Sequence, residues 1–299
     1  MNNIKLLIFG GNGWIGQKFL NVFNSQHINY KVSLTRANNY EDVITDVENY
    51  KPTHILCCIG RTHGPENSTI DYLELPGKLT ENIRDNMVAP ITLANICSAR
   101  NIHLTYIGTG CIFDYTLQEH FRETGKASDT QYYKETDMPD FFGSAYSTVK
   151  GYTDTLMKSY TNVLNCRIRM PIDSTNNKRN FIAKIINYDK ICSMDNSMTV
   201  LDQIIPIIVH MIMTKTTGTF NMTNPGFTNH NDILTKYKNT INPQFKIVNF
   251  TLDEQHNILL SRRSNNVLNT DKLEGYCKVH SLTLDNIANA IDIILDRFD

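Results

Sequence analysis

The sequence predicts an α/β fold in which a doubly wound parallel sheet is followed by a smaller C-terminal α/β lobe. In the first half, short apolar runs alternate with stretches in which apolar residues recur at helical spacing. After Pro171 this alternation gives way to helical pieces separated by short strands and by turns rich in Asn, Pro and Gly. We therefore expect one domain over residues 1–170 and a second over residues 171–299.

The apolar runs of the first half predict strands. The first is almost entirely apolar, as expected for a parallel strand that is covered on both faces. The predicted strands are residues 4–9, 30–34, 53–58, 102–107 and 163–168, and the predicted helices between them are residues 13–23, 40–49, 79–99 and 144–160. Such β-α alternation indicates right-handed crossovers that place helices on both faces of one sheet.

Two further regions complete this prediction. Between Asp114 and Asp140 the periodicity fails, so we expect a long polar loop near the mouth of the sheet, where loops are often functional. In the second half the predicted helices are residues 181–188, 204–213, 230–237 and 282–297. A small lobe beside a larger domain predicts a ligand bound between the two.

Composition excludes several classes of function. The 299 residues include 29 Lys plus Arg and 30 Asp plus Glu, so the net charge of -1 gives no general attraction to nucleic acid or to an anionic membrane. No apolar run reaches membrane-spanning length, and the first residues lack the features of a secretory signal. The seven Cys match no zinc spacing, so we expect no metal site and free thiols in the cytosol.

A glycine-rich turn follows the first predicted strand and opens the first predicted helix. Gly10, Gly13 and Gly16 are spaced Gly-x-x-Gly-x-x-Gly, which lets the backbone approach a pyrophosphate at the helix N-terminus. A plain structural turn is the alternative, but the position inside a β-α-β unit favours a Rossmann-type dinucleotide site. We expect its contacts from Gly10, Asn12, Gly13, Trp14, Ile15 and Gly16.

The end of the second predicted strand indicates which dinucleotide binds. An acidic residue there would hold the ribose 2′-hydroxyl of NAD(H), but Arg36 stands in its place. A guanidinium suits a 2′-phosphate, so the sequence favours NADP(H). The alternative is that Arg36 is a solvated loop charge.

A candidate reducing site lies around the fourth predicted strand. Tyr146 and Lys150 are four residues apart on one helix face, and we expect the cation to lower the pKa of the phenol. Both are also expected to contact the cofactor. Thr109 ends the strand, where its hydroxyl can share a substrate carbonyl with Tyr146. The alternatives are a surface Tyr/Lys pair and a strand-end turn residue.

Together these residues resemble an extended short-chain dehydrogenase/reductase. The resemblance narrows to the plant-type UDP-4-keto-6-deoxyglucose 3,5-epimerase/4-reductase family, which makes UDP-L-rhamnose and is related to dTDP-4-dehydrorhamnose reductase. It covers nearly the whole chain and is carried by residues 10–16, 109–113, the Tyr146/Lys150 pair, 167–171, 179–184, 221–226 and 263–268. The loop between Asp114 and Asp140 departs from the family because it is longer and more acidic.

The resemblance implies a second chemistry at the same ketone. Cys111 matches the family's epimerase Cys, two residues after the catalytic hydroxyl, and Lys184 matches its partner. Protons at C3 and C5 are acidified by the C4 ketone, so a thiolate can remove one and an ammonium can return one on the opposite face. The alternatives are a small buried Cys and a solvated helix charge.

The resemblance also implies the ligand and the assembly. Arg263, Asn180 and Asn224 are expected to contact the sugar nucleotide, although the Arg263 segment and the Asn221–Gly226 turn could be purely structural. We expect a homodimer that converts UDP-4-keto-6-deoxyglucose to UDP-L-rhamnose with NADPH. The dTDP sugar stays open as the substrate. The rival functions are a reductase without epimerase activity, an epimerase holding NAD, and a non-catalytic NADP-binding regulatory subunit.

Overall fold

A computed structural model describes residues 4–65, 67–115, 118–127 and 132–298. Six strands form one sheet in the order β2-β1-β3-β4-β5-β6. Their bounds are Leu6–Phe9 for β1, Tyr30–Val32 for β2, His54–Cys57 for β3, His103–Thr109 for β4, Val163–Ile168 for β5 and Gly218–Asn221 for β6. The pairings of β1 with β2, β1 with β3 and β3 with β4 are parallel. The predicted Rossmann-type sheet is therefore confirmed.

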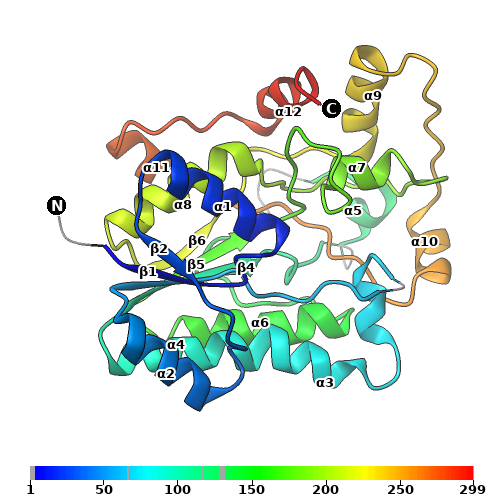
Figure 1. Ribbon diagram of the computed structural model, residues 1–299. Coiled ribbons are helices and arrows are strands. Elements are labelled where there is room, and N and C mark those ends of the chain that lie inside the picture. Colours follow the sequence, from blue (N-terminus) through cyan, green and yellow to red (C-terminus); the bar gives the residue numbers. More distant parts are fainter. Residues whose placement is uncertain (1–3, 66, 116–117, 128–131, 299) are drawn as a thin grey trace. The chain divides into compact units, whose positions relative to one another are not determined.

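Helices cover both faces of this sheet (Figure 1). On one face lie α2 (Tyr40–Tyr50), α4 (Ala89–Ala99) and α6 (Ala145–Met157), and on the other lie α1 (Trp14–Ser25) and α8 (Leu201–Met213). Leu7, Ile55 and Leu104 project from neighbouring strands into one continuous apolar core with Leu93 of α4. Because the strand order reverses at β1, the carboxyl ends of β1 and β3 flank the crevice where such sheets bind ligands.

The helical segment predicted over residues 79–99 is interrupted. It consists of α3 (Lys78–Ile83), a π-helical turn η2 (Arg84–Val88) and α4. Asn86 is fully buried in this turn, and its side-chain amide bonds both the backbone N–H and the carbonyl of Arg61, each at 2.9 Å. The turn thereby fixes the segment that follows β3, which is consistent with the frequent occurrence of π turns at functional sites.

The chain divides into two compact units. The first contains residues 1–112, 138–167 and 205–220, and the second contains residues 113–137, 168–204 and 221–299. The helices of the second unit are α5 (Glu119–Thr124), α7 (Phe181–Ile185), α9 (His230–Thr240), α10 (Leu252–Ile258), α11 (Asp271–Val279) and α12 (Ile287–Leu295). Ile182, Ile233 and Ile291 bring α7, α9 and α12 together in its core.

The predicted loop between Asp114 and Asp140 is largely structured, although residues 116–117 and 128–131 lie outside the described part. It contains the short helix α5, and the ring of Tyr133 stacks on both Phe113 and Tyr115. The backbone N–H of Tyr133 donates to the carbonyl of Val267 at 2.9 Å. These residues therefore pack as part of the second unit.

None of the helices in the described ranges is long and apolar enough to cross a membrane.

Candidate active site

The glycine turn between β1 and α1 has the geometry that a phosphate-binding turn requires. Gly10 has a φ of 82°, and a Cβ on it would lie 2.9 Å from the carbonyl carbon of Cys58. A Cβ on Gly16 would collide with the carbonyl oxygen of Gly10. Gly13 caps α1 without a side-chain hydrogen bond, so the first N–H groups of α1 are left for another acceptor. The backbone is thus shaped for close approach of an anion.

The other predicted residues of the turn differ in exposure. Asn12 is exposed, and Trp14 and Ile15 are partly buried at the start of α1. All three therefore lie beside the capping Gly13, where a bound phosphate would be.

A cavity of about 370 Å³ opens beside this turn. It is lined by Gly10 and Gly13 after β1, by residues 35–38 after β2, and by residues 58–61 after β3. Its size is in the range of small-ligand sites. Arg36 is exposed on the β2 side of the cavity, and its contact with a 2′-phosphate stays a prediction. The carboxyl ends of three neighbouring strands therefore form one pocket of the size and polarity that suit a dinucleotide.

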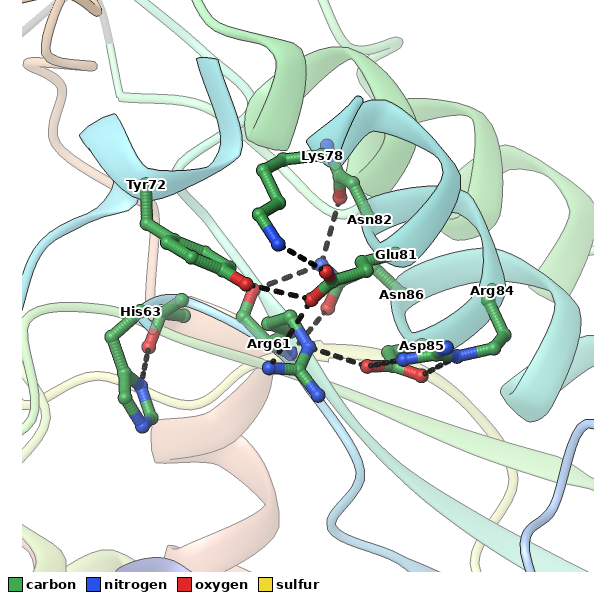
Figure 2. A network of polar contacts seen from close by, with 10 residues as sticks. Arg61, His63, Tyr72, Lys78, Glu81, Asn82, Arg84, Asp85 and Asn86 are labelled. Atoms are coloured by element: carbon green, nitrogen blue, oxygen red, sulfur yellow. Dashed lines mark hydrogen bonds and ion pairs between the residues drawn. The ribbon is translucent and has the colours of Figure 1, made fainter. Parts of the chain in front are cut away.

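A network of charged side chains supports the β3 side of this cavity (Figure 2). The guanidinium of Arg61 bonds Asp85 at 2.5 Å and lies 3.6 Å from Glu81, and Arg84 bonds the same Asp85 at 2.7 Å. Burial alone would raise the pKa of Asp85, but the hydrogen bonds from Arg84 and Arg61 outweigh it and lower that pKa. Arg61 and Asp85 both line the cavity. No local sequence pattern predicts this wall, because Arg61 and Asp85 are 24 residues apart in the chain.

The residues predicted to act on the ketone meet at the carboxyl end of β4. Tyr146, in the first turn of α6, forms a hydrogen bond with the side chain of Thr109 and packs against Cys111. The backbone N–H of Cys111 donates to the Thr109 hydroxyl at 3.1 Å. Thr109 and Tyr146 are buried, and Cys111 is partly exposed. The hydroxyl, phenol and thiol thus surround one position.

The charge states of the Tyr146/Lys150 pair differ from the expectation. Burial raises the pKa of Tyr146, the Cys111 charge raises it further, and the Thr109 hydrogen bond only partly opposes them. The prediction that Lys150 lowers the pKa of Tyr146 is therefore wrong, because the cost of burying the phenolate dominates. Burial lowers the pKa of the Lys150 ammonium to about 8. Tyr146 is accordingly a protonated phenol, the form that can donate a proton to a carbonyl oxygen.

Two groups that were not predicted from the sequence fix the start of α6. Ser144 caps the helix by accepting from the backbone N–H of Ser147 at 3.0 Å. The Glu74 carboxylate accepts from the backbone N–H of Ala145 at 2.7 Å. A carboxylate at a helix N-terminus is favoured by the free N–H groups there. Together they hold Tyr146 in the first turn; the Ser-x-x-Ser spacing was visible in the sequence, whereas Glu74 gave no local signal.

In the second unit, Lys184 lies in a cationic cluster. Burial lowers the pKa of the Lys184 ammonium, and the positive charges of Arg179 and Arg263 lower it further. Arg263 also donates to the carbonyl of Ser261 at 3.2 Å. The two guanidinium groups therefore lie near the ammonium, and such a set of cations is suited to binding an anion such as a diphosphate. The pairing of Lys184 with Cys111, which belongs to the first unit, stays a prediction.

Asn180 and Asn224 are fully buried and make structural hydrogen bonds. Asn180 caps α7, and its amide nitrogen donates to the carbonyls of Asp173 and Thr175, each at 2.7 Å. The side chain of Asn224 accepts from the backbone N–H of Val200 at 2.9 Å and donates to Gln203 at 2.8 Å. Their predicted substrate contacts stay predictions, and these bonds favour the structural alternative.

The fold and these side chains define a class: a Rossmann-type reductase of the short-chain type with an added thiol at its carbonyl site. Comparison with known proteins narrows the class. The chain is 48% identical over 273 residues to protein L780 of Acanthamoeba polyphaga mimivirus, covering 91% of this chain and 92% of that protein. The solved structure of L780, described as a UDP-rhamnose synthase, superimposes with a TM-score of 0.92 at 45% identity and 99% coverage of both chains.

Two other relatives extend the comparison. A bifunctional dTDP-4-dehydrorhamnose 3,5-epimerase/reductase of Arabidopsis thaliana is 39% identical over 274 residues, covering 91% of this chain and 87% of that protein. A dTDP-4-dehydrorhamnose reductase of Bacillus anthracis, solved with NADP, has a TM-score of 0.77 at 16% identity over 99% of this chain and 98% of that chain, and shows the shared fold. No protein-family model matches the chain.

The chain belongs to the family of nucleotide-sugar 3,5-epimerase/4-reductases, and it is an enzyme with oxidoreductase and isomerase chemistry. The reductase-only and non-catalytic alternatives are not favoured.

Proposed function

We propose that this enzyme converts UDP-4-keto-6-deoxy-D-glucose to UDP-L-rhamnose by epimerising C3 and C5 and reducing C4 with NADPH. The observation that carries the proposal is the cluster of the Thr109 hydroxyl, the Tyr146 phenol and the Cys111 thiol at the end of β4. UDP is the proposed nucleotide because the solved L780 structure, which matches nearly end to end, is described as a UDP-rhamnose synthase.

In the epimerase steps, the Cys111 thiolate removes the proton on C3 or C5. Thr109 and Tyr146 donate hydrogen bonds to O4, which becomes the enolate oxygen, and so stabilise its charge. Lys184 returns a proton to the opposite face of the same carbon. The lowered pKa of Lys184 supports this role, because a lower pKa makes the ammonium a stronger proton donor. Each epimerisation moves protons only and consumes no cofactor.

In the reductase step, Tyr146 donates its phenolic proton to O4. Bound NADPH supplies the hydride that C4 takes up. The phenol is protonated beforehand because burial raises its pKa, and Lys150 stabilises the phenolate that is left. The same hydrogen bonds to the carbonyl oxygen thus serve both reactions.

The cofactor is NADP(H), with the pyrophosphate on the turn formed by Gly10, Gly13 and Gly16. The steric demands at Gly10 and Gly16 and the uncapped N–H groups of α1 support this placement. Arg36, exposed beside the cavity after β2, pairs with the 2′-phosphate.

The second unit supplies the sugar-nucleotide site. We place Arg263 and Lys184 of this unit at the diphosphate. The positive charges of Arg179 and Arg263, which lower the pKa of Lys184, support an anion site there. The proposed location is the cytosol, which the seven free thiols support.

A homodimer is also part of the proposal. Tyr152 and Leu156 lie one turn apart on α6 and are 59% and 45% exposed, which supplies an apolar strip for a second copy. Analytical ultracentrifugation of the wild-type protein and a Tyr152→Glu variant tests this. We expect a wild-type dimer that the charge weakens, and a wild-type monomer would contradict it.

The catalytic proposal is tested with two variants. Purified enzyme is incubated with the UDP keto-sugar and NADPH in deuterated water. Tyr146→Phe should reduce NADPH oxidation at least about 100-fold, while Cys111→Ala should abolish deuterium incorporation at C3 and C5. Cys277→Ala, which removes a buried thiol of the second unit, is the control. Full NADPH oxidation by Tyr146→Phe, or unchanged deuterium exchange by Cys111→Ala, would contradict the assignment.

A further inference from the structure

Tyr106 is a second tyrosine beneath the catalytic pair. It lies on β4, three residues before Thr109, and its side chain is 1% exposed. It projects from the sheet toward the helices α4 and α6, among the apolar residues of that face. A buried phenol needs a hydrogen-bond partner, because an unpaired hydroxyl in the core is costly. The partner of the Tyr106 hydroxyl is a residue of the proposed reductase site.

The partner is Lys150. The ammonium nitrogen of Lys150 donates to the Tyr106 hydroxyl at 2.5 Å, and it lies 4.6 Å from the centroid of the Tyr106 ring. Both residues belong to the first unit, and Lys150 is only 3% exposed. The phenol therefore accepts the hydrogen bond of a buried cation, and its ring face adds a cation–π contact.

Other groups near Lys150 also favour its charged form. Three titratable groups influence it from packed elements: Cys57 of β3, Cys111 after β4 and Asp154 of α6. The pKa of the Cys57 thiol is raised to about 11 by burial, so it carries no charge near neutral pH. Asp154 is already bound on both carboxylate oxygens by the buried guanidinium of Arg167, at 2.9 and 2.6 Å.

We propose that Tyr106 is a positioning residue whose hydroxyl holds the Lys150 ammonium charged and in place beside Tyr146. This inference rests on the proposed function, since it assigns Lys150 its role in the reductase step. Tyr106 touches neither substrate nor cofactor in this account and acts only through Lys150.

The charge balance around Lys150 fits this role. Burial lowers the pKa of Lys150 to about 8, so the ammonium stays charged at neutral pH by a narrow margin. An acceptor that stabilises the ammonium keeps the pKa from falling further. Removing the acceptor should therefore convert part of the enzyme to the neutral amine in the working pH range.

The test is Tyr106→Phe, which keeps the ring and removes the hydroxyl. A lost hydrogen bond to a charged group should lower the pKa of Lys150 by about one unit. The basic limb of the pH profile of kcat/KM for NADPH oxidation should therefore shift to lower pH by about one unit. Activity should fall about eightfold at pH 8.5 and less than about twofold at pH 6, as a one-unit shift from a pKa near 8 requires.

A direct titration separates this inference from the proposed function. The NMR signal of the Lys150 side chain, assigned with Lys150→Arg in protein carrying labelled lysine, reports its pKa whether or not any sugar is turned over. Tyr160→Phe is the matched control, because it removes a phenol that bonds Asn95 at 2.7 Å elsewhere in the first unit. We expect its Lys150 titration to match the wild type.

The outcomes are distinct. A Lys150 pKa that is unchanged in Tyr106→Phe overturns the inference, as does an activity loss of equal size at every pH. A shifted pKa in a protein that turns over no keto-sugar would uphold the contact and refute the proposed function instead.

Discussion

Replacing Arg167 with Met should destabilise the first unit severely. Arg167 lies on β5 and is fully buried, and it pairs with Asp154 of α6 through two hydrogen bonds of 2.9 and 2.6 Å. Asn165 donates a further bond to the same carboxylate at 2.7 Å. Without the guanidinium, the Asp154 carboxylate, whose side chain is 4% exposed, would be left in the core without its cation.

The magnitude follows from that burial. Removing one partner of a buried ion pair costs about 3–5 kcal/mol, because the remaining charge has lost both water and its counter-charge. In a chain of 299 residues that loss corresponds to a fall in Tm of about 5–8 °C. Urea unfolding at pH 7, followed by circular dichroism, measures the free energy of unfolding directly.

A double variant separates charge from packing. Combining Arg167→Met with Asp154→Leu removes both charges, and we expect it to recover most of the lost stability. If the single variant loses less than about 1 kcal/mol, or if the double variant is no more stable than the single one, the reasoning fails.

Two further predictions concern the cofactor and the pH. Arg36→Ala should weaken NADPH binding about 10- to 100-fold by removing a charge-assisted contact and should leave NADH binding unchanged, as measured by NADPH and NADH fluorescence; equal losses for both would contradict it. Burial, together with the positive charges of His103 and Lys215, lowers the pKa of His54 from 6.5 to about 4. The unfolded chain therefore binds more protons between these values, so stability should fall as the pH drops through that window, by on the order of 3 kcal/mol. In urea unfolding, His54→Gln should reduce the fall in the free energy of unfolding between pH 6.5 and 4. An unchanged pH dependence would contradict this prediction.

The sequence predicted the first half of the fold well because its signals are local. Each buried parallel strand is a short apolar run, and each is followed by a helix with regular apolar spacing. β5 was predicted at its observed bounds, Val163–Ile168. The π-helical turn η2 was missed because it is stabilised by the contact of Asn86 with the distant Arg61 segment.

The second half was harder to predict. α10 and α11 were missed, and their apolar residues are few: Leu252 is the only buried residue of α10, while α11 buries Leu273 and Cys277. Such helices are set by capping and by packing on the rest of the unit, as the capping box of Thr251 and Glu254 illustrates. Strand β6 is four residues long and was also missed, since its partner β5 lies about 50 residues earlier.

At the candidate site, the sequence predicted which side chains converge but not their charge states. Thr109 and Cys111 lie at the carboxyl end of β4, and Tyr146 lies in the first turn of α6, which packs on the same sheet. These positions follow from the predicted alternation of strands and helices. The raised pKa of Tyr146 could not be predicted, because it results from burial that only the packed structure shows. The roles of Glu74 and Tyr106 also depend on residues that are far away in the chain.

The proposed function requires that one ketone is both epimerised and reduced at the Thr109, Cys111 and Tyr146 cluster. The most direct measurement is incubation of the wild-type enzyme with UDP-4-keto-6-deoxyglucose in deuterated water, with and without NADPH, followed by NMR of the sugar. We predict deuterium at C3 and C5 in both samples and L-rhamnose only with NADPH. A reduced sugar that keeps the D-configuration and its original protons at C3 and C5 would contradict the account.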